Sequence, residues 1–347
     1  MPFIMNAWYV AAWPREVEPG KVLARTICNE PLVLFRDAAG AAAALEDRCC
    51  HRQMPLAKGW LENGTLRCGY HGLRFDGRGK CVETPGQASI PPRARVRAFP
   101  LVERDGWLWV WPGEAVKADP ALIPQIFERM DHPEWTACGG TTYVRCHYQL
   151  ISDNLLDLTH ETYIHRSSLG NQAVVEHPIT TKGDAAGVDV QRLIPNHEPA
   201  PFWKATLFGK LGKHVMADRW QLIHFEPPAN LVLDVGVTPA GRPRAEGVEG
   251  CNTNAITPET EDSTWYFWGF ARKFGRDDEQ LSRNLVETVA RIFEEDREAC
   301  EAVHAVMKRS RGRAVIDVNA DRGTILARRL VAERLKAEQS SSAQAAE

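Results

Sequence analysis

Cys49-Cys50-His51-Arg52 and Cys68-Gly69-Tyr70-His71-Gly72 are the two stretches that decide the fold of the first third of the chain. They follow the patterns C-x-H and C-x2-H, so each stretch offers one thiolate and one imidazole. A Rieske [2Fe–2S] centre requires this division, because two cysteines bind one of its irons and two histidines bind the other. The sequence therefore predicts a Rieske cluster whose ligands are Cys49, His51, Cys68 and His71.

A structural zinc site is the alternative for these four residues. Zinc sites usually pair like with like, as C-x2–4-C followed by H-x3–5-H, and the mixed pairs argue against one. Cys50 is expected not to be a ligand, because the two stretches already supply two cysteines. The other six of the nine cysteines lack metal-ligand spacing and are expected to be small buried residues: Cys28, Cys81, Cys138, Cys146, Cys251 and Cys300.

Short strands separated by turn residues surround the two stretches. Val22–Ile27 and Gly106–Trp111 are rich in aliphatic and aromatic residues, which is typical of β-strands. Asn63-Gly64 is one of several turn signals between such runs. Pro112–Pro124 is a turn-rich connector. We therefore expect a small all-β domain over residues 1–115.

Two histidines and two aspartates lie within Asp153–His165, which otherwise has the apolar pattern of a buried helix. Imidazole and carboxylate suit a non-haem ferrous iron, particularly as two histidines and one carboxylate with open positions. His160 and His165 are five residues apart, which places them on different faces of a regular helix. If both bind one metal, the helix must end or bulge between them. The alternative is a set of polar residues on a solvated helix.

A late segment, Asp277–Arg309, is expected to be helical because its apolar residues follow the helical period. Asp296 falls on the apolar stripe, three residues after Phe293 and four after Ile292. Burial of an unpaired carboxylate costs several kcal/mol, so this aspartate should meet a cation. That cation is either a metal or a neighbouring arginine, and the residues alone leave both open.

The second domain is expected over residues 116–335, as an α+β fold in which helices cover an antiparallel sheet. Strand-like runs such as Leu231–Val237 extend from about Val174 to Phe270, and Pro201–Lys204 lies among them. Residues 336–347 are expected to form a disordered tail.

The composition is that of an ordinary globular protein. Of the 347 residues, 44% are hydrophobic and 25% are charged, and the net charge is −3. This balance favours neither a nucleic acid nor an anionic membrane as partner. No run approaches the ~20 apolar residues that span a bilayer, and Met1–Asn6 lacks the features of a secretory signal. We expect a cytoplasmic protein that acts on a small molecule.

The chain resembles the Rieske non-haem iron oxygenases over nearly its whole length. Within them it is similar to the vanillate O-demethylase oxygenase branch, near toluenesulfonate methyl-monooxygenase and dicamba monooxygenase. The resemblance rests on Asn6–Ala11, Gly69–Leu73, Val82–Gln87 and Trp109–Gly113. It implies that a helix-grip-like catalytic domain follows the Rieske domain. Cys50 stands where these families usually carry proline, and the toluenesulfonate group has a similar double cysteine.

The resemblance also implies roles for particular residues. Glu294-Glu295-Asp296-Arg297 matches the place of the family's third iron ligand, so His160, His165 and Asp296 are expected to bind a mononuclear Fe(II). Asp157 is expected to bridge, through hydrogen bonds, an iron-ligating histidine and a Rieske histidine of a neighbouring subunit, which implies a homotrimer. Asn154 is expected near the iron.

The implied activity is that of a terminal oxygenase component. A flavin/ferredoxin-type reductase would pass electrons from NADH to the Rieske cluster and then to the iron, with O2 as co-substrate. The expected reaction hydroxylates or O-demethylates a small aromatic acid, such as a vanillate-like methoxybenzoate, and releases formaldehyde. Methyl-group hydroxylation of an aryl sulfonate or carboxylate, and ring dihydroxylation, are the alternatives within the superfamily. A non-catalytic Rieske electron carrier is the alternative of another class, and the second domain argues against it.

Overall fold

The chain folds into two compact units in the computed structural model, which describes residues 3–310 and 313–344. The first unit comprises residues 3–123 together with Thr257–Thr260, and the second comprises the remaining described residues. The division at Ile123 falls inside the connector, later than the boundary near residue 115 that the sequence suggests.

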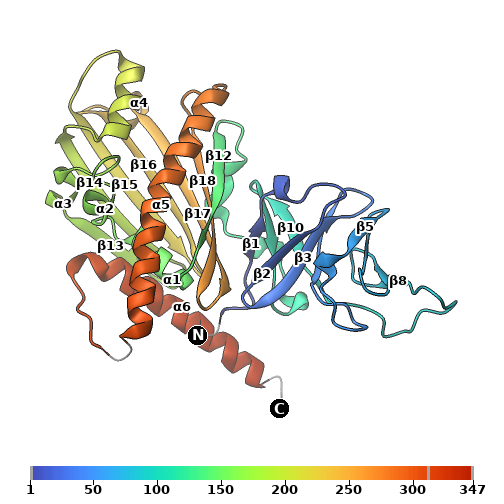
Figure 1. The fold of residues 1–347 in the computed structure, drawn as a ribbon. Helices are drawn as coiled ribbons and strands as arrows, with labels where there is room; N and C mark the ends of the chain where they lie inside the picture. Colours follow the sequence, from blue (N-terminus) through green and yellow to red (C-terminus); the bar gives the residue numbers. More distant parts are fainter. Residues whose placement is uncertain (1–2, 311–312, 345–347) are drawn as a thin grey trace. The chain divides into compact units, whose positions relative to one another are not determined.

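The first unit is built from three small antiparallel sheets (Figure 1). One sheet has the order β1-β11-β10, the second β2-β3-β4-β9 and the third β5-β6-β7-β8. The strands are β1 (Tyr9–Ala12), β2 (Leu23–Ile27), β3 (Glu30–Arg36), β4 (Ala42–Glu46), β5 (Trp60–Glu62), β6 (Thr65–Arg67), β7 (Arg74–Phe75), β8 (Cys81–Glu83), β9 (Ala98–Phe99), β10 (Leu101–Arg104) and β11 (Trp107–Val110). The expectation of an all-β first domain is therefore confirmed.

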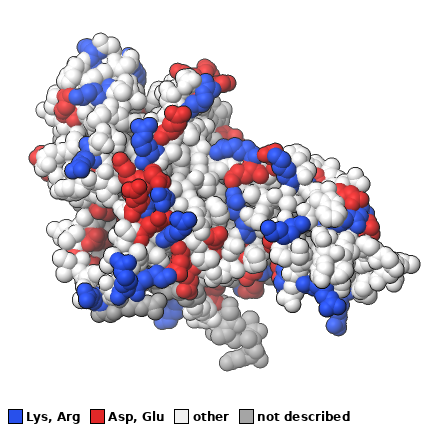
Figure 2. Space-filling model, viewed as in Figure 1, with Lys and Arg blue, Asp and Glu red and all other residues white. Residues whose placement is uncertain are grey.

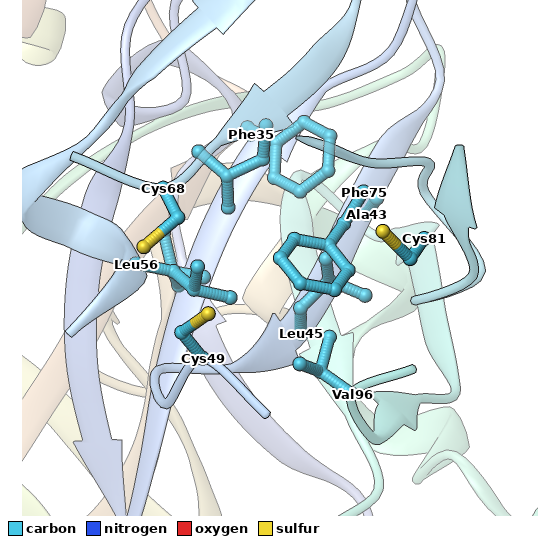
Figure 3. Packing of buried hydrophobic residues seen from close by; sticks show 11 residues of the cluster. Phe35, Ala43, Leu45, Cys49, Leu56, Cys68, Phe75, Cys81 and Val96 are labelled. Atoms are coloured by element: carbon cyan, nitrogen blue, oxygen red, sulfur yellow. The ribbon is translucent and has the colours of Figure 1, made fainter. Parts of the chain in front are cut away.

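One hydrophobic cluster of this unit packs directly against the two Cys-His stretches (Figure 3). Cys49 and Cys68 lie together at one end of the cluster beside Leu56, whereas Cys81 lies at the opposite end beside Phe75. All five of these residues are almost completely buried. The cluster fixes the two stretches relative to each other, because close-packed side chains leave little room for movement.

The second unit has a seven-stranded antiparallel sheet with the order β12-β18-β17-β16-β15-β14-β13 (Figure 1). Its strands are β12 (Thr136–Val144), β13 (Ile179–Gly183), β14 (Val188–His197), β15 (Ala217–Glu226), β16 (Asn230–Pro239), β17 (Val248–Thr260) and β18 (Ser263–Arg272). Alternate residues of a strand point to the same face, so Arg219 and Gln221 of β15 share a face with Val235 of β16.

Helices cover this face of the sheet, as the α+β expectation requires (Figure 1). The helices are α1 (Tyr148–Leu156), α2 (Glu161–Ile164), α3 (Gln172–Glu176), α4 (Pro201–Leu211), α5 (Glu279–Arg309) and α6 (Arg322–Gln344). Short 3-10 turns lie at Pro14–Glu16, Leu56–Lys58, Ala115–Lys117, Pro120–Leu122, Gln125–Met130, Arg244–Glu246 and Asn319–Asp321. The long helix α5 contacts α1 and β12, and its buried stripe includes Ile292, Phe293 and Asp296.

Two expectations about secondary structure were wrong. Pro201–Lys204 begins helix α4, not a strand, because proline at the first helical position suits a helix start and Gly212 ends the helix in the left-handed conformation. Residues 336–344 are the end of α6, not a disordered tail, because α6 packs its earlier turns against α1, β13 and β14 and the helix continues from there. Residues 345–347 lie outside the described part.

Charges of both signs are interspersed over the face drawn in Figure 2. No single-sign field covers that face, which agrees with the near-neutral composition. Among the described residues, no helix has the length and apolar character needed to cross a membrane.

Candidate metal centres and substrate cavity

A break between α1 and α2 brings His160 and His165 toward one point. Helix α1 ends at Leu156, and residues 157–160 form a connector before the one-turn helix α2. Asp157 causes the break locally, because its carboxylate accepts a hydrogen bond from the Thr159 amide at 2.8 Å, which competes with helical bonding. His160 precedes α2 and His165 follows it. The interruption that the five-residue spacing required is therefore present.

Asp296 on α5 completes a cluster of three potential metal ligands. Its Oδ1 lies 3.1 Å from His165 Nε2 and 3.5 Å from His160 Nε2. One ligand atom from each of the three residues lies within 4.8 Å of the other two. Asp296 and His165 are buried, and His160 is partly buried. Two imidazoles and one carboxylate in this arrangement suit non-haem ferrous iron.

Hydrogen-bond partners fix the orientation of all three side chains. His160 Nδ1 contacts the Asp157 carbonyl oxygen, and His165 Nδ1 lies 2.7 Å from Glu295 Oε2. Asn154 Nδ2 donates to Asp296 Oδ1 at 3.0 Å. The Nε2 atom of each imidazole therefore faces Asp296 and is available to a metal ion. Metal-binding histidines have this arrangement when a protein oxygen holds the second ring nitrogen.

The electrostatics of the site favour a cation. Burial alone would lower the pKa of His165, but the Asp296 and Glu295 carboxylates outweigh burial and raise this pKa to about 9. The positive charge of protonated His165 is stabilised by the Asp296 and Glu295 carboxylates. A bound metal ion would supply the same charge, so the residues fit the iron that two histidines and a carboxylate predict.

An apolar cavity adjoins the three residues. Its walls come from the sheet, from α4 and from α5, and their aromatic members are Phe202, Trp203, Phe270 and Phe293. The aliphatic members include Leu155, Leu158, Leu169, Leu233, Val235, Val289 and Ile292. Mostly apolar walls with a few polar groups are typical of small-molecule sites.

Two residues of opposite charge on the cavity wall, Glu161 and Arg219, neutralise each other. Arg219 Nη1 lies 2.8 Å from Glu161 Oε1, and Gln221 Nε2 donates to the other Glu161 oxygen at 2.6 Å. Asn252 and Asn254 are the uncharged polar residues of the wall. Asn254 accepts a hydrogen bond from Tyr266 at 2.6 Å, whereas Asn252 Oδ1 is buried without a partner among the described residues. Asn252 is therefore a polar group available to a bound molecule.

The two Cys-His stretches of the first unit form matching loops. Cys49 and Cys68 are buried, whereas His51 and His71 are exposed and their ring centroids are 4.7 Å apart. The Gly72 amide donates to the Cys68 carbonyl at 3.1 Å, and Gly72 has φ +74°, a conformation that a residue with a side chain rarely adopts. The loops thus present two sulfurs on the inner side and two imidazoles on the outer side.

The two thiols lie close enough to influence each other. Burial raises the pKa of Cys49 to about 11, and the neighbouring Cys68 thiol contributes to this increase. If Cys49 and Cys68 were both thiolates, they would repel each other unless a cation lay beside both. Thiolates toward the protein core and imidazoles toward solvent match the unequal ligation of a Rieske cluster.

Comparison with known proteins assigns the chain to a family. Residues 7–100 match the model of the Rieske [2Fe-2S] domain, and residues 144–337 match that of the vanillate O-demethylase oxygenase C-terminal domain. The chain belongs to the Rieske oxygenases of the vanillate O-demethylase type. The oxygenase is 40% identical to a vanillate O-demethylase oxygenase subunit from a Pseudomonas species, over 98% of this chain and 97% of that protein.

Two further relatives carry names of related chemistry. The dicamba O-demethylase oxygenase component of Stenotrophomonas maltophilia is 39% identical over 94% of both chains. The toluene-4-sulfonate monooxygenase iron-sulfur subunit of Comamonas testosteroni is 38% identical over 98% of this chain and 99% of that one. A crystal structure of dicamba monooxygenase with 3,6-dichlorosalicylic acid superposes with a TM-score of 0.92 at 34% identity, covering 98% of this chain and 99% of that one.

Family membership confirms the expected class of enzyme. The oxygenase is a Rieske-type monooxygenase whose cofactors are a Rieske [2Fe–2S] cluster and a mononuclear iron. A non-catalytic electron carrier is excluded, because the match to an oxygenase C-terminal domain covers the second unit. Relatives named as oxygenase subunits or components imply a separate reductase as partner.

Sequence reasoning missed several residues that the structure places around the iron-binding point. Glu295 holds His165, and Glu161 pairs with Arg219 on the cavity wall. Glu161 lies inside the stretch Asp153–His165, directly after His160, and this position could have indicated that it lies near the metal site. Arg219 stands in Asp218–Trp220, which resembles a segment of vanillate demethylases, but its pairing with Glu161 was not predicted. Asn252 gave no signal, because a single polar residue in a strand is usually solvated.

Proposed function

We propose that the oxygenase O-demethylates a small aromatic acid, such as a vanillate-like methoxybenzoate. The observation that carries the proposal is the position of His160, His165 and Asp296 at the wall of an apolar, aromatic-lined cavity. Relatives with nearly the same length are named for vanillate and dicamba O-demethylation, which supports an aryl methyl ether as substrate. Asn252 offers a polar anchor for a ring substituent.

We assign one set of metal ligands in each unit, from the chemical type of the side chains that lie there. His160, His165 and Asp296 would hold the ferrous iron, with two or three positions left open for substrate chemistry. Cys49 and Cys68 would bind one iron of the Rieske cluster, and the two exposed histidines of these loops would bind the other. Asn154 would keep Asp296 in place through its hydrogen bond.

The protein contributes binding, orientation and exclusion of water. When bound, the ferrous iron supplies reductive activation of O2, which leads to hydroxylation of the substrate methyl carbon. The apolar walls keep the methoxy group beside the metal ligands and exclude bulk water. The Glu161–Arg219 pair adds no net charge to the wall. A hydroxylated methyl ether is a hemiacetal, and its C–O bond breaks to give a phenol and formaldehyde.

We infer that Asp157 links the iron site to the Rieske cluster of a second copy, within a trimer. Asp157 is partly exposed and contacts His160 through its carbonyl oxygen. It lines a groove of the second unit together with Val303, Val315 and Ile316. Val303, Val315 and Ile316 are 49%, 88% and 87% exposed and line the same groove, and a contiguous patch of exposed apolar residues is typical of an interface. Sedimentation equilibrium at micromolar protein would give three times the chain mass. A monomer would contradict the proposed trimer and the link through Asp157.

Electrons would come from NADH through a flavin/ferredoxin-type reductase, which places the enzyme in the cytoplasm where NADH is available. The exposed edges of His51 and His71 are suited to electron exchange.

Product analysis tests the proposed reaction. Purified oxygenase, a reductase of this type, NADH and O2 are combined with a methoxybenzoate whose methyl group carries ¹³C. The proposal predicts equal amounts of labelled formaldehyde and of the phenol. A methyl-substituted benzoate or sulfonate serves as the comparison substrate. Conversion of that compound to a benzyl alcohol, without demethylation of the methoxybenzoate, would contradict O-demethylation and favour methyl hydroxylation.

A further inference from the structure

Arg192 is a buried cation that lies next to the connector between the iron ligands. It stands on β14 and is only 3% exposed. No carboxylate of the described residues lies within ion-pair distance of its guanidinium. Instead its three nitrogens donate to neutral oxygens: Nη1 to Leu158 O at 2.8 Å, Nη2 to Thr159 Oγ1 at 3.1 Å and Nε to His177 O at 3.2 Å.

Two of these acceptors belong to the four-residue connector, residues 157–160. The connector lies outside α1 and α2, and Arg192 supplies the hydrogen-bond donors for the Leu158 carbonyl and the Thr159 hydroxyl. Thr159 in turn donates its amide to the Asp157 carboxylate at 2.8 Å, and the Asp157 carbonyl contacts His160 Nδ1. A continuous chain of contacts therefore leads from Arg192 to both Asp157 and His160.

The third acceptor ties another segment to the same guanidinium. His177 follows α3, which comes after the second histidine ligand in the chain. Arg192 thus joins the connector and the end of α3 to the sheet. A planar guanidinium with donors in fixed directions suits this, because it can hold several acceptors in one geometry.

The energetic cost of this arrangement suggests a role beyond packing. Burial lowers the pKa of Arg192, and the carboxylates of Glu161 and Asp157 only partly offset that decrease. An apolar side chain of similar volume would avoid the desolvation of a cation. Such a replacement would remove the hydrogen bonds that hold the connector, and Asp157 and His160 would lose their fixed positions.

We propose that Arg192 is a positioning residue that holds the connector so that the His160 imidazole and the Asp157 carboxylate keep their directions. The inference rests on the proposed function of His160 as an iron ligand. Arg192 does not touch the iron-binding point and acts through the connector.

Arg272 provides a matched control. It is also a fully buried arginine on a strand of the same sheet, and it donates to the carbonyls of Gly275 and Asp278 and to the Ser282 hydroxyl. These acceptors lie at the start of α5, away from the connector. Arg272→Met therefore removes a buried guanidinium and its hydrogen bonds without changing the contacts of residues 157–160.

The experiment titrates ferrous iron anaerobically into full-length protein from which the mononuclear iron has been removed. Wild type, Arg192→Met, Arg192→Lys, Thr159→Val and Arg272→Met are compared, and thermal unfolding is recorded for each. Loss of contacts that orient a metal ligand typically weakens binding about 10- to 100-fold. We expect a decrease of this size for Arg192→Met, a smaller decrease for Thr159→Val, partial rescue in Arg192→Lys, and wild-type affinity for Arg272→Met.

Equal iron affinity in Arg192→Met and wild type would overturn the inference, as would equal losses in Arg192→Met and Arg272→Met. If Arg192→Met does not fold, Thr159→Val and Arg192→Lys decide in the same way. If wild-type protein binds no ferrous iron at this site, the proposed function fails instead, so the two failures are distinguishable. A second readout is the oxidation rate of the pre-reduced Rieske cluster, which should fall in Arg192→Met and not in Arg272→Met.

Discussion

The buried pair of Glu161 and Arg219 allows a quantitative test of how the cavity wall is held together. The two side chains are 8% and 1% exposed, with Nη1 and Oε1 2.8 Å apart. Glu161→Leu would leave the Arg219 guanidinium buried, with the Leu169 carbonyl at 3.2 Å and the Trp203 ring, whose centroid is 6.0 Å away, as its neighbours. Removal of one partner from a buried ion pair costs about 3–5 kcal/mol.

This cost corresponds to a large shift of the thermal transition of the second unit. For a domain of ~200 residues, each kcal/mol lowers the midpoint by about 2–4 °C, so the expected decrease is roughly 6–20 °C. Arg219→Met should have a similar effect, because it leaves the Glu161 carboxylate with Gln221 alone. The double variant Glu161→Leu/Arg219→Met should recover most of the loss, since apolar replacement of a whole buried pair is often neutral.

The assay is thermal unfolding followed by far-ultraviolet circular dichroism, with visible absorbance of the Rieske cluster recorded in parallel. The cluster signal reports the first unit separately. The reasoning would be refuted if each single variant unfolded within about 2 °C of wild type, or if the double variant lost the sum of the two single losses.

Three further predictions concern the cluster, the proposed link and the pH dependence of stability. Cys68→Ser should abolish the visible absorbance of the Rieske cluster and leave the mononuclear iron; an intact cluster spectrum would argue against Cys68 as a ligand. Asp157→Asn should retain both centres but reduce oxidation of the pre-reduced cluster at least 10-fold; an unchanged rate would remove the proposed role. Hydrogen bonding to Glu226, together with Asp189, raises the pKa of His224 to about 9 in the folded state. Unfolded histidine has a pKa of about 6.5, so this stabilisation is complete below that pH and is lost as the pH rises to about 9. His224→Gln should flatten the decrease in midpoint over that range, modestly because the side chain is 34% exposed; an identical pH profile would contradict the assignment.

The patterns that could be predicted from sequence were those in which residue type and spacing both carry chemical information. The C-x-H and C-x2-H stretches specify a mixed ligand set, and the structure places the two cysteines in one buried cluster and the two histidine rings 4.7 Å apart. The helical period of Asp277–Arg309 predicted α5, and the aspartate on its apolar stripe is buried beside both histidines. The sheet followed from its strongly apolar strands.

Features that depend on tertiary packing could not be predicted in this way. Pro201–Lys204 has aromatic residues typical of a strand, yet its position between two strands of the sheet allows a helix whose Trp203 lines the cavity. Helix α6 has a weakly amphipathic sequence, and its contacts with α1 and the sheet come from residues distant in sequence. Arg192 and Arg219 are single charges in strands, and only the fold places them beside the connector and Glu161.

The central claim is that one chain carries a Rieske cluster and a separate iron held by His160, His165 and Asp296. We would measure iron and acid-labile sulfide in anaerobically purified wild type and in His160→Ala. A [2Fe–2S] cluster contributes two irons and two sulfides. The account predicts three irons and two sulfides per chain in wild type, decreasing to two irons with unchanged sulfide in the variant. Equal iron contents in the two proteins would contradict the assignment of the second centre, and zinc without sulfide would contradict both centres.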